Sequence, residues 1–213
     1  MTYKYAVFDW DGTLADTYPA IAAAFDYTFE KMSQPKISYD EIRKITGTLQ
    51  NKDTMGYLFG EKKQEAAKFF YEYIEKYHTR NLAPQPEAED LLEFCKNRNI
   101  NCYLFTNKTT KFIYAELKFL GFTEYFKKIV AAGEYAEDKP HPVACSAVFD
   151  GNIPPVNEIV VIGDGAADVK TAKALGGADC IIYDRNNTYK GEKPKYKVCR
   201  LFDAIKILEK NNA

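Results

Sequence analysis

Two aspartates, Asp9 and Asp11, stand two positions apart directly after a short apolar run, and Gly12 follows them. The apolar run predicts a buried strand, and the glycine lets the chain turn sharply after it. In a doubly wound sheet, the carboxyl ends of the strands are where ligands bind. Two like charges at such a place are costly unless a cation or a shared reaction employs them. An ordinary Asp-Gly turn is the competing interpretation.

Two later segments carry polar side chains that could bind an anion. Thr106 and Asn107 end a second apolar run with a hydroxyl and an amide, which are suitable donors to phosphate oxygens. A Thr-Asn helix cap is the alternative role for this pair. Lys139 precedes Pro140 at a predicted helix entrance, where a lysine could neutralise phosphate charge or simply be solvated.

A fourth segment, from Gly163 to Asp168, ends a strongly apolar run and opens a predicted helix. Asp164 and Asp168 stand four positions apart around this turn, so both carboxylates can face one point. Helix capping is the competing role, more for Asp168 than for Asp164. Each of these three later segments thus lies at the end of a predicted strand or the start of a predicted helix.

The elements that would position these residues alternate between short apolar runs and longer helical patterns. The predicted strands are Lys4–Phe8, Asn101–Phe105, Lys128–Ala131, Glu158–Ile162 and Cys180–Tyr183. The predicted helices lie near Pro86–Asn97, Thr109–Leu120, Pro142–Phe149, Ala166–Leu175 and Leu201–Lys210. This alternation predicts an α/β fold with a doubly wound parallel sheet and helices on both faces. The polar, Lys-rich stretch Asn186–Lys197 is predicted to be a surface loop.

One interval, residues 16–82, shows helical patterns and no convincing strand. Pro19–Met32 is one predicted helix, and a stripe from Ala66 to Tyr77 recurs at helical spacing. Several helices inserted directly after the first strand predict a small α-helical cap domain over 16–82. The catalytic core is then predicted to comprise residues 1–15 and 83–213.

The composition of the chain indicates which partners and which compartment to expect. The chain has 213 residues, 46% of them apolar, and a net charge of −1, which argues against nucleic acid or an anionic membrane surface as a partner. The five cysteines are odd in number and form no CxxC pair, which favours a reducing compartment. No segment approaches the roughly 20 apolar residues of a membrane span. We therefore expect a soluble, cytoplasmic protein, and no feature of the sequence indicates its oligomeric state.

Taken in order, the four segments resemble the motifs of the haloacid dehalogenase-like hydrolase superfamily: DxDGT, then Thr or Ser, then Lys, then GDxxxD. In this chain they are Asp9-x-Asp11-Gly12-Thr13, Thr106-Asn107, Lys139-Pro140 and Gly163-Asp164-x-x-x-Asp168. The resemblance spans almost the whole chain and implies a Rossmann-like core. The helical insertion matches the cap position of the subgroup that contains phosphoglycolate phosphatases and β-phosphoglucomutases.

The resemblance implies a role for each motif residue. Asp9 would be the nucleophile that attacks phosphorus, and Asp11 the general acid and base. Mg²⁺ would be bound by the carboxylates of Asp9 and Asp164 and the backbone carbonyl of Asp11. Asp168 would be a weaker ligand that holds metal-bound water or the catalytic lysine. Finally, the phosphoryl oxygens would be bound by Lys139, Thr106 and Asn107.

The resemblance leaves several reactions open. Phe105-Thr106-Asn107-Lys108 resembles the phosphoglycolate phosphatase form of the second motif more than the mutase form, which favours a hydrolase acting on a small phosphorylated metabolite. A phosphosugar mutase of the β-phosphoglucomutase type, a pyrophosphatase and a nucleotidase are the alternatives within the superfamily. A phosphonate-cleaving relative would need a cap lysine, for which Lys31, Lys44 and Lys52 are candidates.

Two further expectations concern the cap and a rival class of protein. The segment Thr46–Lys52 is predicted to determine substrate specificity. The rival is a signalling module that becomes phosphorylated on aspartate without turnover. Two features argue against it: Asp11 supplies an acid and base, and a cap would enclose the site.

Overall fold

A computed structural model describes residues 2–46 and 51–212, with the backbone alone described for residues 43, 46 and 51–53. The chain divides into two compact units. The core unit comprises the residues up to Asp16 and those from Ala83 onward, and the helical unit comprises Thr17–Leu82. No described helix is both long and apolar enough to cross a membrane.

The core unit is built on a parallel sheet that has six strands among the described residues, in the order β5-β4-β1-β6-β7-β8. The strands are β1 Tyr5–Phe8, β4 Asn101–Thr109, β5 Phe126–Ala132, β6 Ile159–Gly163, β7 Asp179–Tyr183 and β8 Tyr196–Val198. The predicted doubly wound α/β fold is therefore confirmed.

Strand β1 lies at the centre of the sheet, between β4 and β6. The chain builds β4 and β5 on one side of β1 and then crosses to build β6, β7 and β8 on the other. In the register of the sheet, Phe8 at the end of β1 pairs with Leu104 and with Ile162. The strand order thus reverses around β1, so the carboxyl ends of β1, β4 and β6 form the place where such sheets bind ligands.

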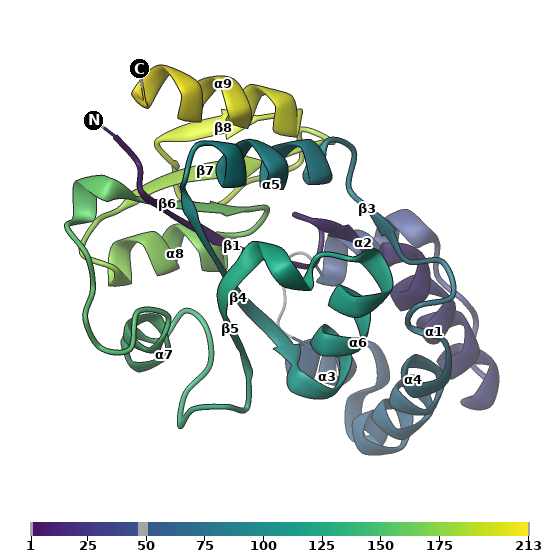
Figure 1. The fold of residues 1–213 in the computed structure, drawn as a ribbon. Coiled ribbons are helices and arrows are strands. Elements are labelled where there is room, and N and C mark those ends of the chain that lie inside the picture. Colours follow the sequence, from purple (N-terminus) through teal and green to yellow (C-terminus); the bar gives the residue numbers. More distant parts are fainter. Residues whose placement is uncertain (1, 47–50, 213) are drawn as a thin grey trace. The chain divides into compact units, whose positions relative to one another are not determined.

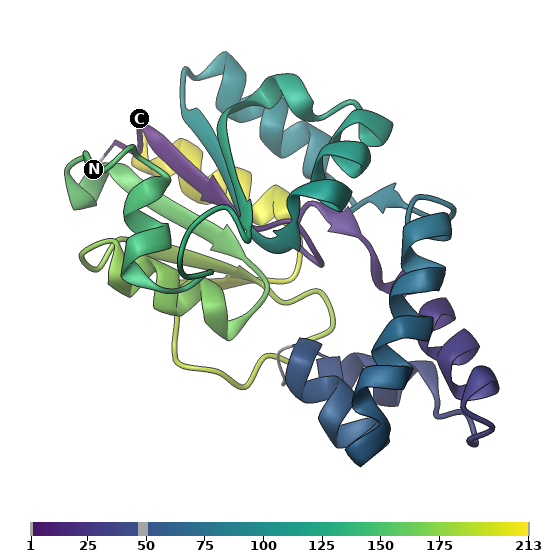
Figure 2. The same ribbon diagram turned by 90° about the horizontal axis from the view of Figure 1, so that it is seen from below.

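Helices cover both faces of this sheet (Figures 1 and 2). One face carries α5 Ala88–Asn97, α6 Thr110–Leu120 and α9 Leu201–Asn211, and the other carries α7 Pro142–Ala147 and α8 Ala166–Ala174. Because successive strand residues point to opposite faces, each strand contributes to two cores. Val7, Val161 and Ile182 belong to the core beneath α7 and α8.

Buried cysteines and a capped helix start are two local features of the core unit. Four cysteines are buried: Cys95, Cys102, Cys145 and Cys180. At the start of α7, Pro142 occupies the first turn, and the His141 ring accepts a hydrogen bond from the Val143 N–H. The His141 side chain therefore caps the start of α7.

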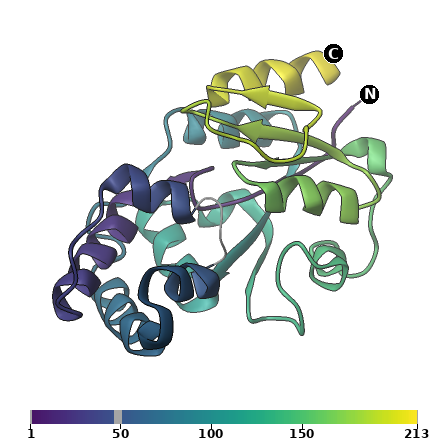
Figure 3. The same cartoon turned by 180° about the vertical axis from the view of Figure 1, so that it is seen from behind.

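The helical unit contains α1 Tyr18–Lys31, α2 Tyr39–Thr46, α3 Asn51–Phe59 and α4 Lys63–Tyr77 (purple and blue in Figure 3). Helix α4 buries the predicted stripe against α1, where the Phe25 and Phe70 rings lie 4.8 Å apart between centroids. Phe29 of α1 and Phe59 of α3 pack at 5.1 Å. The aromatic residues thus form the core of this unit. A short 3-10 turn at Gly60–Lys62 connects α3 to α4, and two others lie in the core unit, at Thr123–Tyr125 and Val156–Glu158.

Two short pairings were not predicted. Residues Ala15–Asp16 (β2) and Ala83–Pro84 (β3) form an antiparallel ribbon where the chain leaves and re-enters the core unit. The prediction of a loop over Asn186–Lys197 is wrong at its end, because β8 begins at Tyr196 and pairs with β7. This edge strand has only three residues, too few for an alternating apolar pattern to be recognised in the sequence.

Candidate active site

Asp9 follows the last residue of β1, and its backbone N–H donates to the carbonyl of Ile162 on β6 at 2.9 Å. Both carboxylate oxygens have a partner. The Lys139 ammonium donates to Oδ1 at 2.8 Å, and the Thr13 hydroxyl donates to Oδ2 at 3.2 Å. The carboxylate of Asp9 is therefore held in one orientation at the carboxyl end of the central strand.

Lys139 connects three parts of the core unit. Its Nζ also lies 2.5 Å from Asp168 Oδ1 and donates to the Phe105 carbonyl of β4 at 3.0 Å. Its side chain is only 3% exposed. The lysine thus joins the end of β1, the middle of β4 and the first turn of α8. In the sequence, only the resemblance to the family motifs connects these segments. In the structure they are in direct contact through Lys139.

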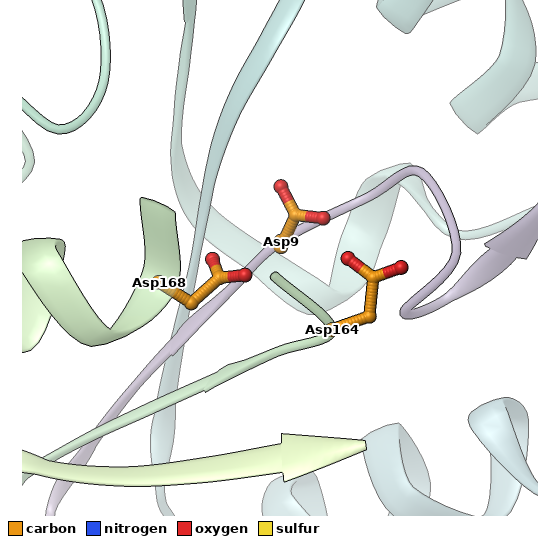
Figure 4. Close-up of side chains that lie close together, drawn as sticks. All are labelled: Asp9, Asp164 and Asp168. Atoms are coloured by element: carbon orange, nitrogen blue, oxygen red, sulfur yellow. The ribbon is translucent and has the colours of Figure 1, made fainter. Parts of the chain in front are cut away.

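Three carboxylates converge beside Lys139: Asp9, Asp164 and Asp168 (Figure 4). Each offers one oxygen that lies within 4.8 Å of the oxygens offered by the other two. They come from the end of β1, the end of β6 and the start of α8. Hard oxygen donors of this kind are the ligands that Mg²⁺ prefers, so the donor set fits that ion.

The position of Asp168 depends on the glycine at the end of β6. Asp168 Oδ2 accepts a hydrogen bond from the Gly165 N–H at 2.9 Å and so caps α8. A Cβ atom at Gly163 would stand 1.9 Å from the Asp168 Cγ, which is an impossible overlap. Because Oδ1 is paired with Lys139, both oxygens of Asp168 have partners within the protein.

Burial and mutual repulsion shift the pKa values of this cluster. Burial raises the pKa of Asp9 to about 6; the charge of Lys139 opposes this shift, and those of Asp168 and Asp11 add to it. Burial, followed by the charges of Asp9 and Asp168, holds the pKa of Asp164 well above its ordinary value. Burial disfavours the charged form of Lys139, but Asp168 and Asp9 outweigh it and raise the pKa of Lys139. A single ammonium therefore does not balance three carboxylates.

Asp11 lies in the turn that follows β1. Gly12 adopts a φ of 80°, a left-handed conformation that side chains disfavour, and its N–H donates to the Ala15 carbonyl at 2.9 Å. The Asp11 side chain is 35% exposed, and its Oδ1 accepts from the Lys108 ammonium at 2.6 Å. Asp11 is absent from the three-carboxylate cluster, so its carboxyl is available for another task.

Thr106 and Asn107, which were predicted to bind phosphate together with Lys139, differ in exposure. Thr106 follows Phe105 on β4; its side chain is buried, and its Oγ1 accepts from the Lys108 N–H at 3.1 Å. Asn107 is exposed. Phe105 itself contacts Lys139 through its carbonyl, which places this segment at the same edge of the sheet as Asp9.

Sequence reasoning gave no role to three residues that complete the site. Thr13 belongs to the quoted first motif, yet its hydrogen bond to Asp9 depends on the shape of the turn. Lys108 belongs to the quoted second motif, and its contact with Asp11 joins residues 97 positions apart. Glu116 could have been found as a charged residue at helical spacing among the apolar Phe112, Ile113 and Leu117.

Residues 6–182 match the family model described as haloacid dehalogenase-like hydrolase. A phosphoglycolate phosphatase of Neisseria meningitidis serogroup A is 30% identical over 178 residues, which cover 79% of this chain and 75% of the relative. The pyrophosphatase PpaX of Oceanobacillus iheyensis is 26% identical and covers 98% of both chains.

Solved structures share the fold. A haloacid dehalogenase-like family hydrolase of Streptococcus pneumoniae superposes with a TM-score of 0.82 at 21% identity, covering 96% of this chain and 98% of that one. The HAD-hydrolase YfnB of Bacillus subtilis, solved with bound magnesium, superposes with a TM-score of 0.76 at 21% identity, covering 98% and 100%.

Proposed function

The chain belongs to the haloacid dehalogenase-like hydrolase family, and from this premise we propose that it is a magnesium-dependent phosphatase of a small phosphorylated metabolite. The reaction passes through an aspartyl-phosphate on Asp9. The observation that carries the proposal is the buried contact of Asp9 with Lys139, beside Asp164 and Asp168. A nucleophile, a cation for the phosphoryl group and metal ligands are thereby within reach of one another.

Hydrolysis proceeds in two displacements. In the first, an Asp9 oxygen bonds to phosphorus as the ester P–O bond breaks, and Asp11 gives its proton to the leaving oxygen. In the second, a water oxygen bonds to phosphorus as the bond to Asp9 breaks, and Asp11 takes the proton of the water. Asp11 suits both steps because its carboxyl lies two residues after the nucleophile and outside the acidic cluster.

Mg²⁺, when bound, supplies positive charge that draws the phosphoryl group toward Asp9. The Asp9 and Asp164 carboxylates would hold it, with the Asp11 carbonyl as a third ligand. Asp168 is better suited to orient Lys139, because both its oxygens are already engaged. The magnesium bound to YfnB supports this assignment by likeness of fold alone.

Lys139, Thr106 and Asn107 bind the phosphoryl oxygens in this proposal. The Lys139 ammonium is fixed by Asp9, Asp168 and the Phe105 carbonyl, so its charge is placed before the substrate arrives. The Thr106 hydroxyl accepts a backbone N–H and keeps its own hydrogen for a substrate oxygen.

The helical unit is proposed to act as a cap that selects the substrate. Its expected specificity segment, Thr46–Lys52, has its centre, residues 47–50, outside the described residues. Phosphoglycolate is the first candidate substrate because of the Neisseria meningitidis relative. Pyrophosphate is the second, because the PpaX relative matches over 98% of the chain.

The test is phosphate release from a panel of compounds, with Mg²⁺ and again with excess EDTA. The panel contains phosphoglycolate, hexose phosphates, nucleoside monophosphates, pyrophosphate and p-nitrophenyl phosphate. We expect steady, EDTA-sensitive release from one or a few of them. Release of one equivalent of p-nitrophenolate without release of phosphate would indicate a phospho-accepting switch, and conversion of a hexose phosphate to its isomer would indicate a mutase.

A further inference from the structure

A buried chain of polar contacts lies behind Asp11. The Lys108 ammonium, which donates to Asp11 Oδ1 at 2.6 Å, also lies 2.9 Å from Glu116 Oε2. The Trp10 indole N–H donates to the same Glu116 oxygen at 2.6 Å. The Lys108 side chain is 13% exposed and that of Glu116 only 1%. Asp11 is thus the outer end of a connected chain that runs into the interior.

A buried ion pair of this kind does little by itself for the stability of the fold. Glu116 lies on the buried face of α6 beside Phe112, Ile113 and Leu117. A buried ion pair costs desolvation energy, and apolar residues of similar volume stabilise a core as well or better. The presence of a lysine and a glutamate at such a place therefore suggests a task for Asp11, at the outer end of these contacts.

The backbone around Lys108 directs it toward Asp11. After a register shift between Cys102 and Tyr103, the pairing of β4 with β5 is regular from Tyr103 to Phe105. It resumes only at Thr109, so the strand is irregular again over residues 106–108. Within this irregular stretch the Lys108 N–H is tied to the Thr106 hydroxyl. The same residue therefore contacts a candidate phosphate ligand through its backbone and the candidate acid and base through its side chain.

We propose that Lys108, held in place by Glu116 and Trp10, is a positioning residue that orients the carboxyl of Asp11 for proton transfer. It fixes Oδ1, which leaves Oδ2 to give a proton to the leaving oxygen and then to take one from the attacking water. Because Glu116 balances the charge of Lys108, the pair orients Asp11 without adding net charge beside it. The inference rests on the proposed phosphatase function.

The experiment compares two substrates that differ in their need for a proton. One is the alkyl phosphate that the wild type hydrolyses fastest in the panel above, and the other is 2,4-dinitrophenyl phosphate, whose leaving group departs unprotonated. Single-turnover release of dinitrophenolate then reports transfer to Asp9 alone. The variants are Lys108→Met, Lys108→Arg and Glu116→Gln. The control is Lys128→Met, which removes another ion-paired lysine, on β5, whose ammonium contacts Asp150 and the Ala147 carbonyl.

We expect Lys108→Met to lower kcat for the alkyl ester by about tenfold or more, since proton transfer contributes roughly 10²–10⁴ to such rates. KM should change less than about twofold, and single-turnover release of dinitrophenolate should stay within about twofold of the wild type. Lys108→Arg should recover part of the lost kcat. Glu116→Gln should show the same dependence on the leaving group, and it covers the case in which Lys108→Met fails to fold. The control should match the wild type.

Equal losses on both substrates would overturn the inference, because they would indicate a general structural role. A rise in KM alone would also overturn it, since Lys108 would then bind the substrate. An unchanged kcat in folded Lys108→Met would leave Asp11 independent of the lysine and refute the inference alone. Failure of the wild type to turn over any phosphate ester with Mg²⁺ would instead refute the proposed function.

Discussion

At the scale of the residue, Asp9 combines a fixed orientation with an unfavourable electrostatic environment. Lys139 and Thr13 each hold one of its oxygens, while burial and the neighbouring aspartates raise its pKa to about 6. A carboxylate in this state is well placed to bond to an electrophile and to bind a cation. Removing the charge of Asp9 should therefore lower the rate of the reaction but raise the stability of the metal-free protein.

Asp9→Asn should lower turnover by at least about 10³-fold, because the amide cannot attack phosphorus, and removal of a nucleophile has effects of this size or larger. Phosphate release with Mg²⁺ measures the effect, and circular dichroism verifies that the variant is folded. Substantial residual turnover would refute the role of Asp9 as nucleophile.

The raised pKa of Asp9 also predicts a dependence of stability on pH in EDTA. A carboxyl whose pKa is higher in the folded protein than in the unfolded chain binds its proton more tightly when folded. Its contribution to the free energy of unfolding therefore falls as the pH rises from its ordinary value of 3.8 to about 6. Asp9→Asn should unfold at the same urea concentration as the wild type near pH 3.8 and at a higher one at pH 7.5.

Adding Mg²⁺ at pH 7.5 should reverse this order, because a bound ion stabilises the folded state of the wild type. At a concentration of 100 times its Kd the ion adds about 2.7 kcal/mol to the free energy of unfolding. The variant lacks one ligand and should gain less. A wild type that is already the more stable of the two in EDTA at pH 7.5 would contradict the electrostatic picture.

At the scale of the element, the turn from β6 to α8 depends on space. Asp168 reaches Lys139 only because Gly163 has no side chain where the Asp168 carboxylate lies. Gly163 and Gly165 differ in whether a side chain would fit. A Cβ at Gly165 would meet Asp168 Oδ2 at 3.7 Å, which is an ordinary contact. Neither glycine has a positive φ, so space alone distinguishes them.

Gly163→Ala should displace Asp168, lower activity severely and reduce the free energy of unfolding by about 1–3 kcal/mol, the usual cost of overpacking. Gly165→Ala is the matched control and should retain most of the activity. Urea unfolding and phosphate release measure both effects. Equal behaviour of the two variants would mean that the position of Asp168 does not depend on Gly163.

At the scale of the whole molecule, the helical unit is inserted between two strands that pair with each other. Ala15 of β2 lies opposite Pro84 of β3, so the points where the chain leaves and re-enters the core unit are adjacent. A short linker can therefore join Asp16 to Ala83 without distorting the sheet. The core unit also has its own apolar core between the sheet, α7 and α8.

Replacing Thr17–Leu82 with a short Gly-Ser linker should leave a core unit that unfolds cooperatively and hydrolyses p-nitrophenyl phosphate with Mg²⁺. If the helical unit selects the substrate, the shortened chain should lose the ranking of metabolites by kcat/KM that the full chain shows. The same deletion in Asp9→Asn controls for contaminating phosphatase. An unchanged ranking would mean that specificity resides in the core unit.

The sequence by itself was sufficient for the fold class and for the identity of the motif residues. Strands such as Ile159–Gly163 are continuous apolar runs followed by glycine or aspartate, and this signal is local. It failed for β8, whose three residues are defined by pairing with β7 rather than by any pattern. The roles of Asp9, Asp11 and the other motif residues came from resemblance and stay predictions.

Only the tertiary structure decided which of these residues touch. The contact of Lys139 with Asp9 joins residues 130 positions apart, and that of Lys108 with Asp11 joins residues 97 apart. It also showed that both oxygens of Asp168 are engaged and that Glu116 stands behind Lys108. The physical reason is that residue type and local spacing determine what an element is. The distance between two side chains depends instead on strand order, register and the space left by residues such as Gly163.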